Sequence, residues 1–278
     1  MLIFRGSKIA LLLVVIMVAA IASTGCGGEK DSGTGLSGTV KIAGSTSVQP
    51  LGEELAEAFM DQYPDVNVNV QGGGSSAGIE TAKTGTADIG TTSRELKDEE
   101  KGYGLTETIV AKDGIAIVTN NENKVTDLTM EQVAKIFSGD IKNWKEVGSQ
   151  DGPITVVVRE EGSGTRGAFE EIVLGNAKII DTAIVQNATG AVKTAVTKDV
   201  NAIGFISLGS IDSAVKTITV DGSEPSEENV INGSYKISRP FIFLTANEPS
   251  EATEEFIKFV LSNEGQDIVS EEYIRVNN

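Results

Sequence analysis

The chain has 278 residues, a net charge of −17 at pH 7, a single cysteine and no histidine. The acidic balance argues against nucleic acid as a partner, because nucleic acids are bound by basic surfaces. One cysteine allows no intramolecular disulfide, and the lack of histidine removes imidazole metal sites, serine–histidine catalysis and a histidine pH switch. We therefore expect no bound metal and no cofactor.

The N-terminus has the pattern of a bacterial secretory signal. Basic residues precede an uninterrupted apolar run over 9–22, which is shorter than the roughly 20 residues that a membrane-spanning helix needs. Cys26 stands where lipoprotein signals place their lipidated cysteine, although Ser23 replaces the leucine usual three positions earlier. The pattern predicts a signal peptide over 1–25, a diacylglycerol anchor on Cys26 and a flexible, glycine-rich tether over 26–37.

Three predicted strands each lead through a turn rich in glycine and hydroxyl groups into a helix. The strands are expected over 39–43, 66–70 and 154–158. Glycine allows a sharp turn, and the first amides of each new helix have no partner within the helix. Arg159 adds a guanidinium beside the third turn, so this turn predicts a cradle for an oxyanion. Ordinary helix capping is the alternative reading of a single such turn.

Two enzyme patterns also occur in these turns. Gly162, Gly164 and Gly167 have the spacing of a dinucleotide fingerprint, but intervening residues separate them from the strand, where the fingerprint requires an immediate turn. The stretch 74–78 matches the Gly-x-Ser-x-Gly elbow of serine hydrolases, but no histidine can act as the base. An exported hydrolase or a dinucleotide-dependent oxidoreductase is therefore the alternative from a different class.

The rest of the chain alternates between strands and helices, which indicates an α/β fold. Ser93 and Arg94 end a predicted strand that begins at Ala87, at the edge where open α/β sheets bind ligands. Thr129 and Gln132 form a capping box before a helix that ends at Phe137. Further strands are expected over 114–119, 202–207 and 238–245, further helices over 189–197 and 251–261, and a polar loop over 221–233.

Taken together, the motifs resemble the family of phosphate-binding proteins of the phosphate ABC transporter, the PstS family. The resemblance covers nearly the whole chain after the signal and rests on five stretches in order: 43–50, 72–78, 88–96, 128–144 and 159–167. It implies a type II periplasmic-binding-protein fold, in which two α/β lobes hold one phosphate in the cleft between them. The implied lobes are 38–113 together with 240–278, and 114–239.

The resemblance also implies which residues contact phosphate. Glu161 falls where the family has an acid that orients the arginine, and Ser93 falls where some members carry aspartate. The implied phosphate-binding residues are Thr46, Ser47, Ser75, Ser93, Arg94, Arg159, Ser163, Gly164 and Thr165. No catalytic residue is implied.

We therefore expect a monomeric, lipid-anchored solute-binding protein rather than an enzyme. It would lie on the outer face of the cytoplasmic membrane or in the periplasm, capture inorganic phosphate and deliver it to the permease subunits of an ABC transporter. Binding of another tetrahedral oxyanion, sulfate or molybdate, is the main alternative within the same class.

Overall fold

The computed structural model describes residues 35–246 and 248–277. The predicted signal peptide, Cys26 and residues 26–34 of the predicted tether lie outside these ranges. Leu36, near the end of the predicted tether, is already buried in a hydrophobic core. Within the described ranges, no helix is both long enough and apolar enough to cross a membrane.

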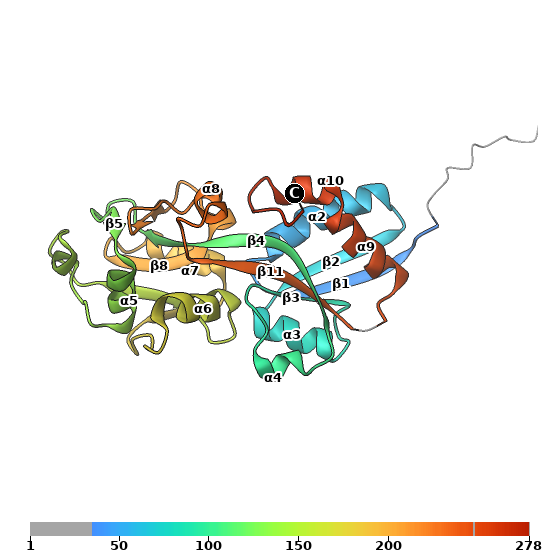
Figure 1. Ribbon diagram of the computed structural model, residues 1–278, viewed down its shortest axis with the longest axis horizontal. Coiled ribbons are helices and arrows are strands. Elements are labelled where there is room, and N and C mark those ends of the chain that lie inside the picture. Colours follow the sequence, from blue (N-terminus) through green and yellow to red (C-terminus); the bar gives the residue numbers. More distant parts are fainter. Residues whose placement is uncertain (1–34, 247, 278) are drawn as a thin grey trace, which may run out of the picture. The chain divides into compact units, whose positions relative to one another are not determined.

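The described strands form one nine-stranded mixed sheet and a separate two-stranded sheet. The large sheet contains β1 (Gly38–Gly44), β2 (Val66–Gly72), β3 (Ile89–Thr92), β4 (Thr106–Thr119), β6 (Thr155–Arg159), β7 (Ile184–Gln186), β8 (Ala202–Ser207), β9 (Lys216–Thr217) and β11 (Ser238–Thr245). Its order is β2-β1-β3-β11-β4-β8-β6-β7, with β9 beside β4 (Figure 1). The small sheet pairs β5 (Asp127–Leu128) with β10 (Thr219–Val220).

Helices follow most strands and pack against the sheet. They are α2 (Gln49–Gln62), α3 (Ser75–Lys83), α4 (Asp98–Lys101), α5 (Met130–Ser138), α6 (Gly164–Phe169), α7 (Thr189–Thr197), α8 (Glu227–Ile231), α9 (Glu251–Leu261) and α10 (Asn263–Val269). Helix α6 continues directly into a π-helical turn over Glu170–Leu174. Short 3-10 turns occupy Trp144–Val147 and Leu208–Ser210.

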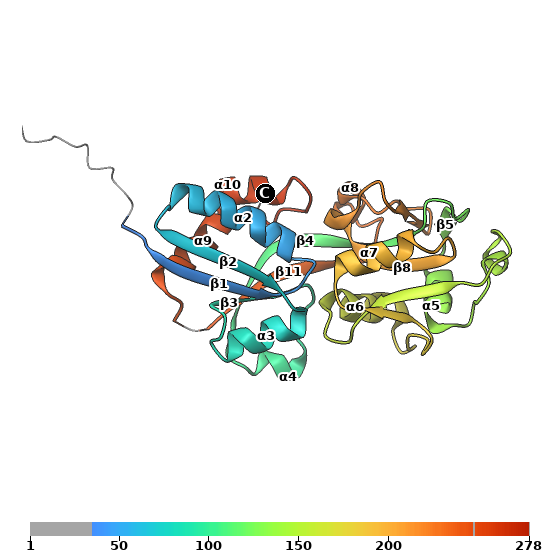
Figure 2. The ribbon, with the colours of Figure 1, turned by 180° about the vertical axis from the view of Figure 1, so that it is seen from behind.

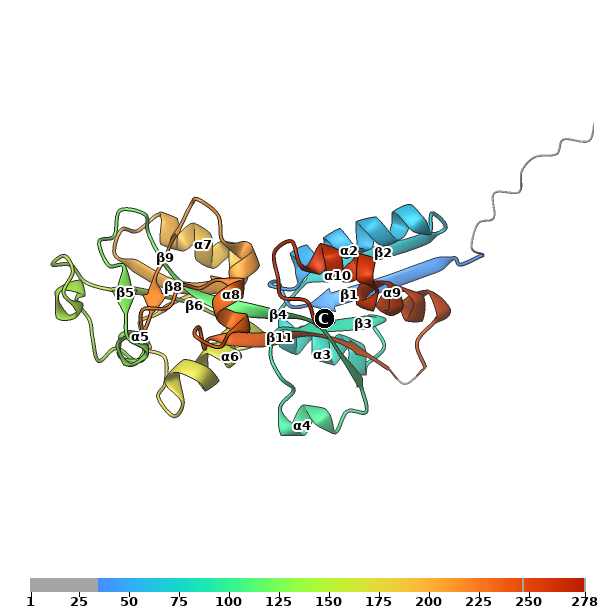
Figure 3. The same cartoon turned by 45° about the horizontal axis from the view of Figure 1, so that its top comes forward.

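Strands β4 and β11 connect two groups of parallel strands (Figure 3). β1 is parallel to β2 and β3, and β6 is parallel to β7 and β8. The long strand β4 pairs with β11 up to Gly114, opposite Ser238, and with β8 from Ile115, opposite Ser207. The lobe boundary predicted after residue 113 therefore falls inside a continuous strand, where its hydrogen-bonding partner changes.

Each group of parallel strands has its own main hydrophobic cluster. We call residues 36–113 and 240–277 the first half of the fold and residues 114–239 the second half. In the first half, the ring of Phe59 meets that of Phe256 edge-on, with ring centroids 5.2 Å apart. In the second half, Phe169 stacks on Phe205 with ring centroids 4.2 Å apart. Each half therefore has a packed core that positions its own loops.

The predicted capping box is confirmed, because Gln132 N donates to Thr129 Oγ1 (3.1 Å) and Thr129 N donates to Gln132 Oε1 (2.8 Å). Other elements differ from the prediction. β4 begins at Thr106 rather than Gly114, and α8 lies inside the stretch that was predicted to be a loop. The first four residues of β4 are exposed or only partly buried and lack the regular alternation of apolar and polar residues that indicates a strand.

Candidate anion-binding site

The loops after five parallel strands meet where the two halves face each other (Figure 2). In the first half they follow β1, β2 and β3, and in the second half they follow β6 and β7. Parallel strands end at the same edge of a sheet, so each half brings its loops to one edge. Polar groups on these loops bond directly across the boundary, since Ser76 N donates to Gly162 O at 3.0 Å.

The loops of the first half supply a cluster of buried hydroxyl groups. Ser45, Ser75 and Ser93 are each at most 3 % exposed. Ser45 Oγ donates to Ser93 Oγ at 2.9 Å, and Ser93 N donates to Ser75 Oγ at 3.1 Å. These bonds join the loops after β1, β2 and β3, so the hydroxyl groups are held at defined positions rather than left to rotate freely.

Hydroxyl groups also join the two halves. Ser47 Oγ, from the loop after β1, lies 2.8 Å from Thr165 Oγ1 and 2.8 Å from Thr189 Oγ1. Thr165 lies in the first turn of α6 and Thr189 in the first turn of α7. Ser163 caps α6, because its Oγ accepts a hydrogen bond from Arg166 N (3.2 Å). The Ser163 hydroxyl hydrogen can therefore still be donated elsewhere.

Gly164 lets the backbone of α6 approach the first half closely. A Cβ atom at this residue would lie 2.3 Å from Ser75 Oγ and 2.7 Å from Ser93 Oγ. Real Cβ atoms do not approach other atoms so closely, so a side chain at position 164 would push the two halves apart. The first amides of α6, which have no partner within the helix, thus begin beside the hydroxyl groups of Ser75 and Ser93.

Arg159 places a fixed positive charge at the same point. It is the last residue of β6 and is 2 % exposed. Its Nε and Nη2 donate to the two carboxylate oxygens of Glu160 at 2.9 and 2.8 Å, and its Nη1 donates to Thr189 Oγ1 at 3.1 Å. Arginine has five N–H groups, so two remain for a further acceptor.

The residue that orients Arg159 is Glu160 rather than the predicted Glu161, which corrects the sequence assignment. Glu161 is exposed and lies in the turn after β6. Glu160 still follows the strand, because its backbone N–H donates to Gln186 O of β7 at 3.0 Å. Its side chain therefore stays beside the arginine, and one carboxylate oxygen lies 3.1 Å from where a Cβ of Gly74 would be.

Arg94, which was predicted to contact the anion, pairs with Glu100 in the structure. Its Nη1 and Nη2 donate to Glu100 at 2.6 and 2.8 Å, and Nη1 also donates to Glu95 O. Burial raises the pKa of Glu100, but hydrogen bonds from Arg94 and from the backbone N–H of Lys97 outweigh burial and lower the pKa below its usual range. Arg94 thus holds the corner after β3 to α4. Three of its five N–H groups have partners, so two remain and its contact with the anion stays a prediction.

Two further hydroxyl residues belong to the cluster and were not predicted. Ser45 directly precedes the predicted Thr46 and bonds to Ser93. Thr189 bonds to Ser47 and Arg159 and is also buried. The signal for Thr189 was the same as for the other turns, because a hydroxyl residue opens a helix after a strand. That strand, β7, has only three residues and two exposed apolar side chains, so it was not recognised.

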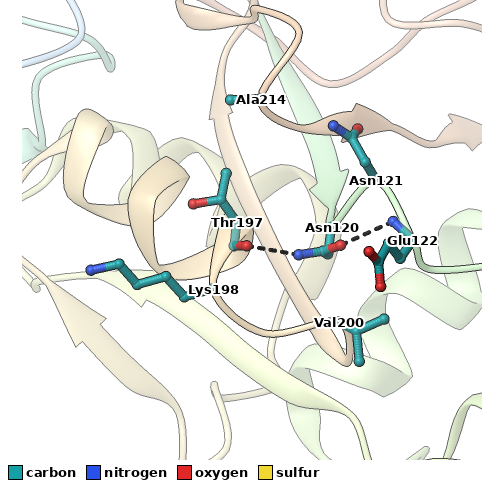
Figure 4. A pocket seen from close by; sticks show the side chains of 7 residues that line it. All are labelled: Asn120, Asn121, Glu122, Thr197, Lys198, Val200 and Ala214. Atoms are coloured by element: carbon teal, nitrogen blue, oxygen red, sulfur yellow. Dashed lines mark hydrogen bonds between the residues drawn. The ribbon is translucent and has the colours of Figure 1, made fainter.

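A surface pocket of about 450 Å³ lies elsewhere in the second half (Figure 4). It is lined by Asn120, Asn121, Glu122, Thr197, Lys198, Val200 and Ala214, none of which is a predicted site residue. Asn120 Nδ2 donates to Thr197 O at 2.9 Å, and Glu122 N donates to Asn120 Oδ1 at 2.9 Å. The side-chain amide of Asn120, in the middle of this pocket, therefore holds loops of the fold together.

Among the residues that the structure describes, no group of three or more acidic, histidine or cysteine side chains is arranged to hold a metal ion.

The fold and the loops at its facing edges define a class of protein. Residues 29–264 match the family model described as a PBP superfamily domain. The chain therefore belongs to the PBP superfamily, which confirms the predicted α/β periplasmic-binding-protein fold.

Curated relatives and solved structures place the chain more narrowly. It is 33 % identical over 274 residues to the phosphate-binding protein PstS of Bacillus subtilis, covering 94 % of this chain and 91 % of that protein. A Clostridium perfringens protein, crystallised with bound phosphate and described as a candidate phosphate ABC transporter substrate-binding protein, is 47 % identical with a TM-score of 0.84, covering 86 % of this chain and 100 % of that one. An ABC-type phosphate transport receptor from Vibrio cholerae is 42 % identical with a TM-score of 0.71, covering 84 % and 99 %. The chain thus belongs to the PstS family, as the sequence motifs indicated.

Proposed function

We propose that this protein is an extracytoplasmic solute-binding lipoprotein that captures inorganic phosphate and delivers it to an ABC transporter. The observation that carries the proposal is the buried cluster of hydroxyl groups around Arg159, at the point where the two halves meet. The membership of the chain in the PstS family supports phosphate as the anion. Binding is the proposed activity, and no covalent step is part of it.

We propose that donors from both halves surround the phosphate. They are the hydroxyl groups of Thr46, Ser47, Ser75, Ser93, Ser163 and Thr165, the amide of Gly164 and the guanidinium of Arg159. Hydrogen bonds to a charged group each contribute about 1.5–3 kcal/mol. A few such bonds are enough to outweigh desolvation and reach micromolar affinity, about −8 kcal/mol.

Selection of an anion must depend on these local donors, because the field of the whole protein is unfavourable. The net charge is −17 at pH 7, which repels anions at long range. Glu160 adds a negative charge beside Arg159, with a side chain that is 29 % exposed. The carboxylate of Glu160 balances the charge of the guanidinium, so the buried arginine stays in place when no anion is bound. The remaining N–H groups of Arg159 are still available to bind an anion.

We propose that the two halves act as lobes that close on phosphate, and that the closed form is the one that the transporter recognises. The partners would be the permease subunits of a phosphate ABC transporter, and a lipid anchor on Cys26 would hold the protein at the outer face of the cytoplasmic membrane. A monomer is sufficient for this role, because one chain supplies every proposed contact.

We expect phosphate to bind about ten- to a hundredfold more tightly than sulfate near neutral pH. Phosphate then carries at least one proton and sulfate carries none, so only phosphate can donate to an acceptor in the site. Ser93 Oγ already accepts one hydrogen bond, from Ser45, and keeps a second lone pair. Competition calorimetry with both anions at one pH and ionic strength measures the preference.

A carboxylate in place of Ser93 provides the matched variant. Ser93→Asp should increase the preference for phosphate over sulfate. A carboxylate accepts a hydrogen bond from the protonated oxygen of phosphate, and it repels the unprotonated oxygens of sulfate. Equal affinities of the wild type for both anions would overturn the phosphate assignment. An unchanged preference in Ser93→Asp would instead show that Ser93 does not face the anion.

We also expect phosphate to draw the two halves together in solution. Ser47 and Ser75 lie on one half and Arg159 and Thr165 on the other, so a shared anion favours their approach. Small-angle scattering should show a smaller radius of gyration with saturating phosphate than with none. An identical scattering curve in both conditions would contradict a binding site shared between the halves.

A further inference from the structure

The first turn of α7 makes polar contacts with three parts of the site. Thr189 is 3 % exposed, and its Oγ1 accepts a hydrogen bond from Arg159 Nη1 at 3.1 Å. The same oxygen lies 2.8 Å from Ser47 Oγ and 3.5 Å from Thr46 Oγ1. Thr189 is therefore the side chain that joins the arginine of the second half to the loop after β1 in the first half.

The backbone of this turn depends on the first half as well. Ala188 precedes α7 and has no side chain that can cap the helix. The amide of Thr189 instead donates to Thr46 Oγ1 at 3.3 Å, across the boundary between the halves. An amide in the first turn of a helix has no partner within the helix, so Thr46 takes the place of a local cap. This bond forms only when the loop after β1 is next to α7.

Thr189 also completes the fixation of Arg159. Glu160 holds one edge of the guanidinium through Nε and Nη2, and Thr189 holds Nη1. A planar group fixed at three of its five N–H groups keeps the other two in one orientation. Ser47 Oγ further connects Thr189 with Thr165 of α6, so a continuous chain of hydrogen bonds runs from Arg159 through both halves.

We propose that Thr189 is a positioning residue, which aims Arg159 at the anion and latches the start of α7 to the loop after β1 when the halves close. This inference rests on the proposed function, which takes inorganic phosphate as the anion that Arg159 binds. It adds the loop after β7 to the site, and it makes Thr46 of the opposite half the residue that caps α7. The expected result is slower release of phosphate from the closed form.

Thr189→Val and Thr189→Ser separate the hydroxyl group from the shape of the side chain. Valine keeps the branched shape but loses the hydroxyl, and we expect it to weaken phosphate binding by about tenfold or more, mainly by faster dissociation. Serine keeps the hydroxyl and should bind phosphate much as the wild type does. Calorimetry gives the affinities, stopped-flow mixing gives the dissociation rates, and thermal unfolding shows that both variants fold.

A cycle with Arg159→Lys tests whether Thr189 acts through the arginine. If it does, Thr189→Val should cost much less affinity in the Arg159→Lys protein than in the wild type, because the shared interaction is already lost. Three results would each overturn the proposal. Thr189→Val could bind phosphate as tightly as the wild type, or Thr189→Ser could lose as much affinity as Thr189→Val. The losses of affinity from Thr189→Val and Arg159→Lys could also be additive in the double variant.

Hydrogen exchange separates this proposal from the proposed function. With saturating phosphate, when the halves are closed, amide exchange at the start of α7 should be faster in Thr46→Val than in the wild type, because the cap from the opposite half is gone. If the wild type binds phosphate and Thr46→Val leaves this exchange unchanged at saturation, the latch is overturned and the proposed function stands. A wild type that binds no phosphate in calorimetry would overturn both.

Discussion

We expect Arg159→Lys to weaken phosphate binding by about a hundredfold or more, which corresponds to about 3 kcal/mol from the loss of two charge-assisted hydrogen bonds. The arginine reaches Glu160 and Thr189 at once and still has N–H groups for the anion. Lysine has one ammonium group, which cannot hold these partners and a phosphate in the same plane. Calorimetry with inorganic phosphate measures the loss, and thermal unfolding should show a folded protein.

Arg275→Lys is the matched control for this change. Arg275 pairs with Asp267 at 3.4 Å on the partly exposed C-terminal segment, away from the hydroxyl cluster. Exposed pairs of this kind contribute about 0–1 kcal/mol, so the control should bind phosphate as the wild type does. Wild-type affinity in Arg159→Lys would show that the anion binds elsewhere.

The sequence was sufficient to predict the loops of the site, because three of them share one local pattern. Each has a buried strand, a turn with glycine and hydroxyl residues, and a helix, and these features depend only on neighbouring residues. The pattern predicted the loops, and the resemblance to the PstS family then assigned Ser47, Ser75 and Thr165 within them. The structure brings all three into the buried cluster. Their loops meet because parallel strands end at a common edge.

Contacts between residues distant in sequence could not be predicted from such patterns. Thr189 follows a three-residue strand that is too short to recognise, and its importance comes from Thr46 and Arg159, far away in the chain. Arg94 was assigned to the anion because it ends a strand, and the structure adds a partner, Glu100, that the sequence did not predict. The sequence spacing between Arg94 and Glu100 does not correspond to neighbouring positions on one helix, so no periodic pattern shows the pair.

The choice between Glu160 and Glu161 shows that the sequence does not predict the end of a strand to the exact residue. Both acids follow Arg159 in the sequence, and either could reach it. The last backbone hydrogen bond between the end of β6 and β7, from Glu160 N to Gln186 O, keeps Glu160 in line with the strand. Glu161 then lies in the turn and is exposed. A difference of one residue in where a strand ends decided which carboxylate orients the arginine.

The crossing strands contain another buried ion pair, which is separate from the anion site. Arg239 of β11 lies opposite Asp113 of β4, and its Nη2 donates to Asp113 Oδ2 at 2.8 Å. Both residues are at most 3 % exposed, and Leu208 N donates to the other carboxylate oxygen at 3.1 Å. Among the described residues, Arg239 Nε and Nη1 have no hydrogen-bond partner.

Burial disfavours the charge on both members of this pair. It raises the pKa of Asp113, while Arg239 opposes the shift, and it lowers the pKa of Arg239, while Asp113 opposes it. Two desolvated charges and the unpaired N–H groups on two guanidinium nitrogens make the intact pair a modest contributor to stability at best. Either residue alone is far worse, because its charge is then buried without compensation.

Asp113→Leu and Arg239→Met should therefore each lower the free energy of unfolding by about 3–5 kcal/mol, whereas the double variant should lose much less than either. The double variant removes both charges and the unpaired N–H groups of Arg239, and it leaves apolar side chains between β4 and β11. Denaturant unfolding of the wild type, both single variants and the double variant gives the coupling energy. Additive losses would mean that the two side chains stabilise the crossing strands independently, by packing, and that their charges do not compensate each other.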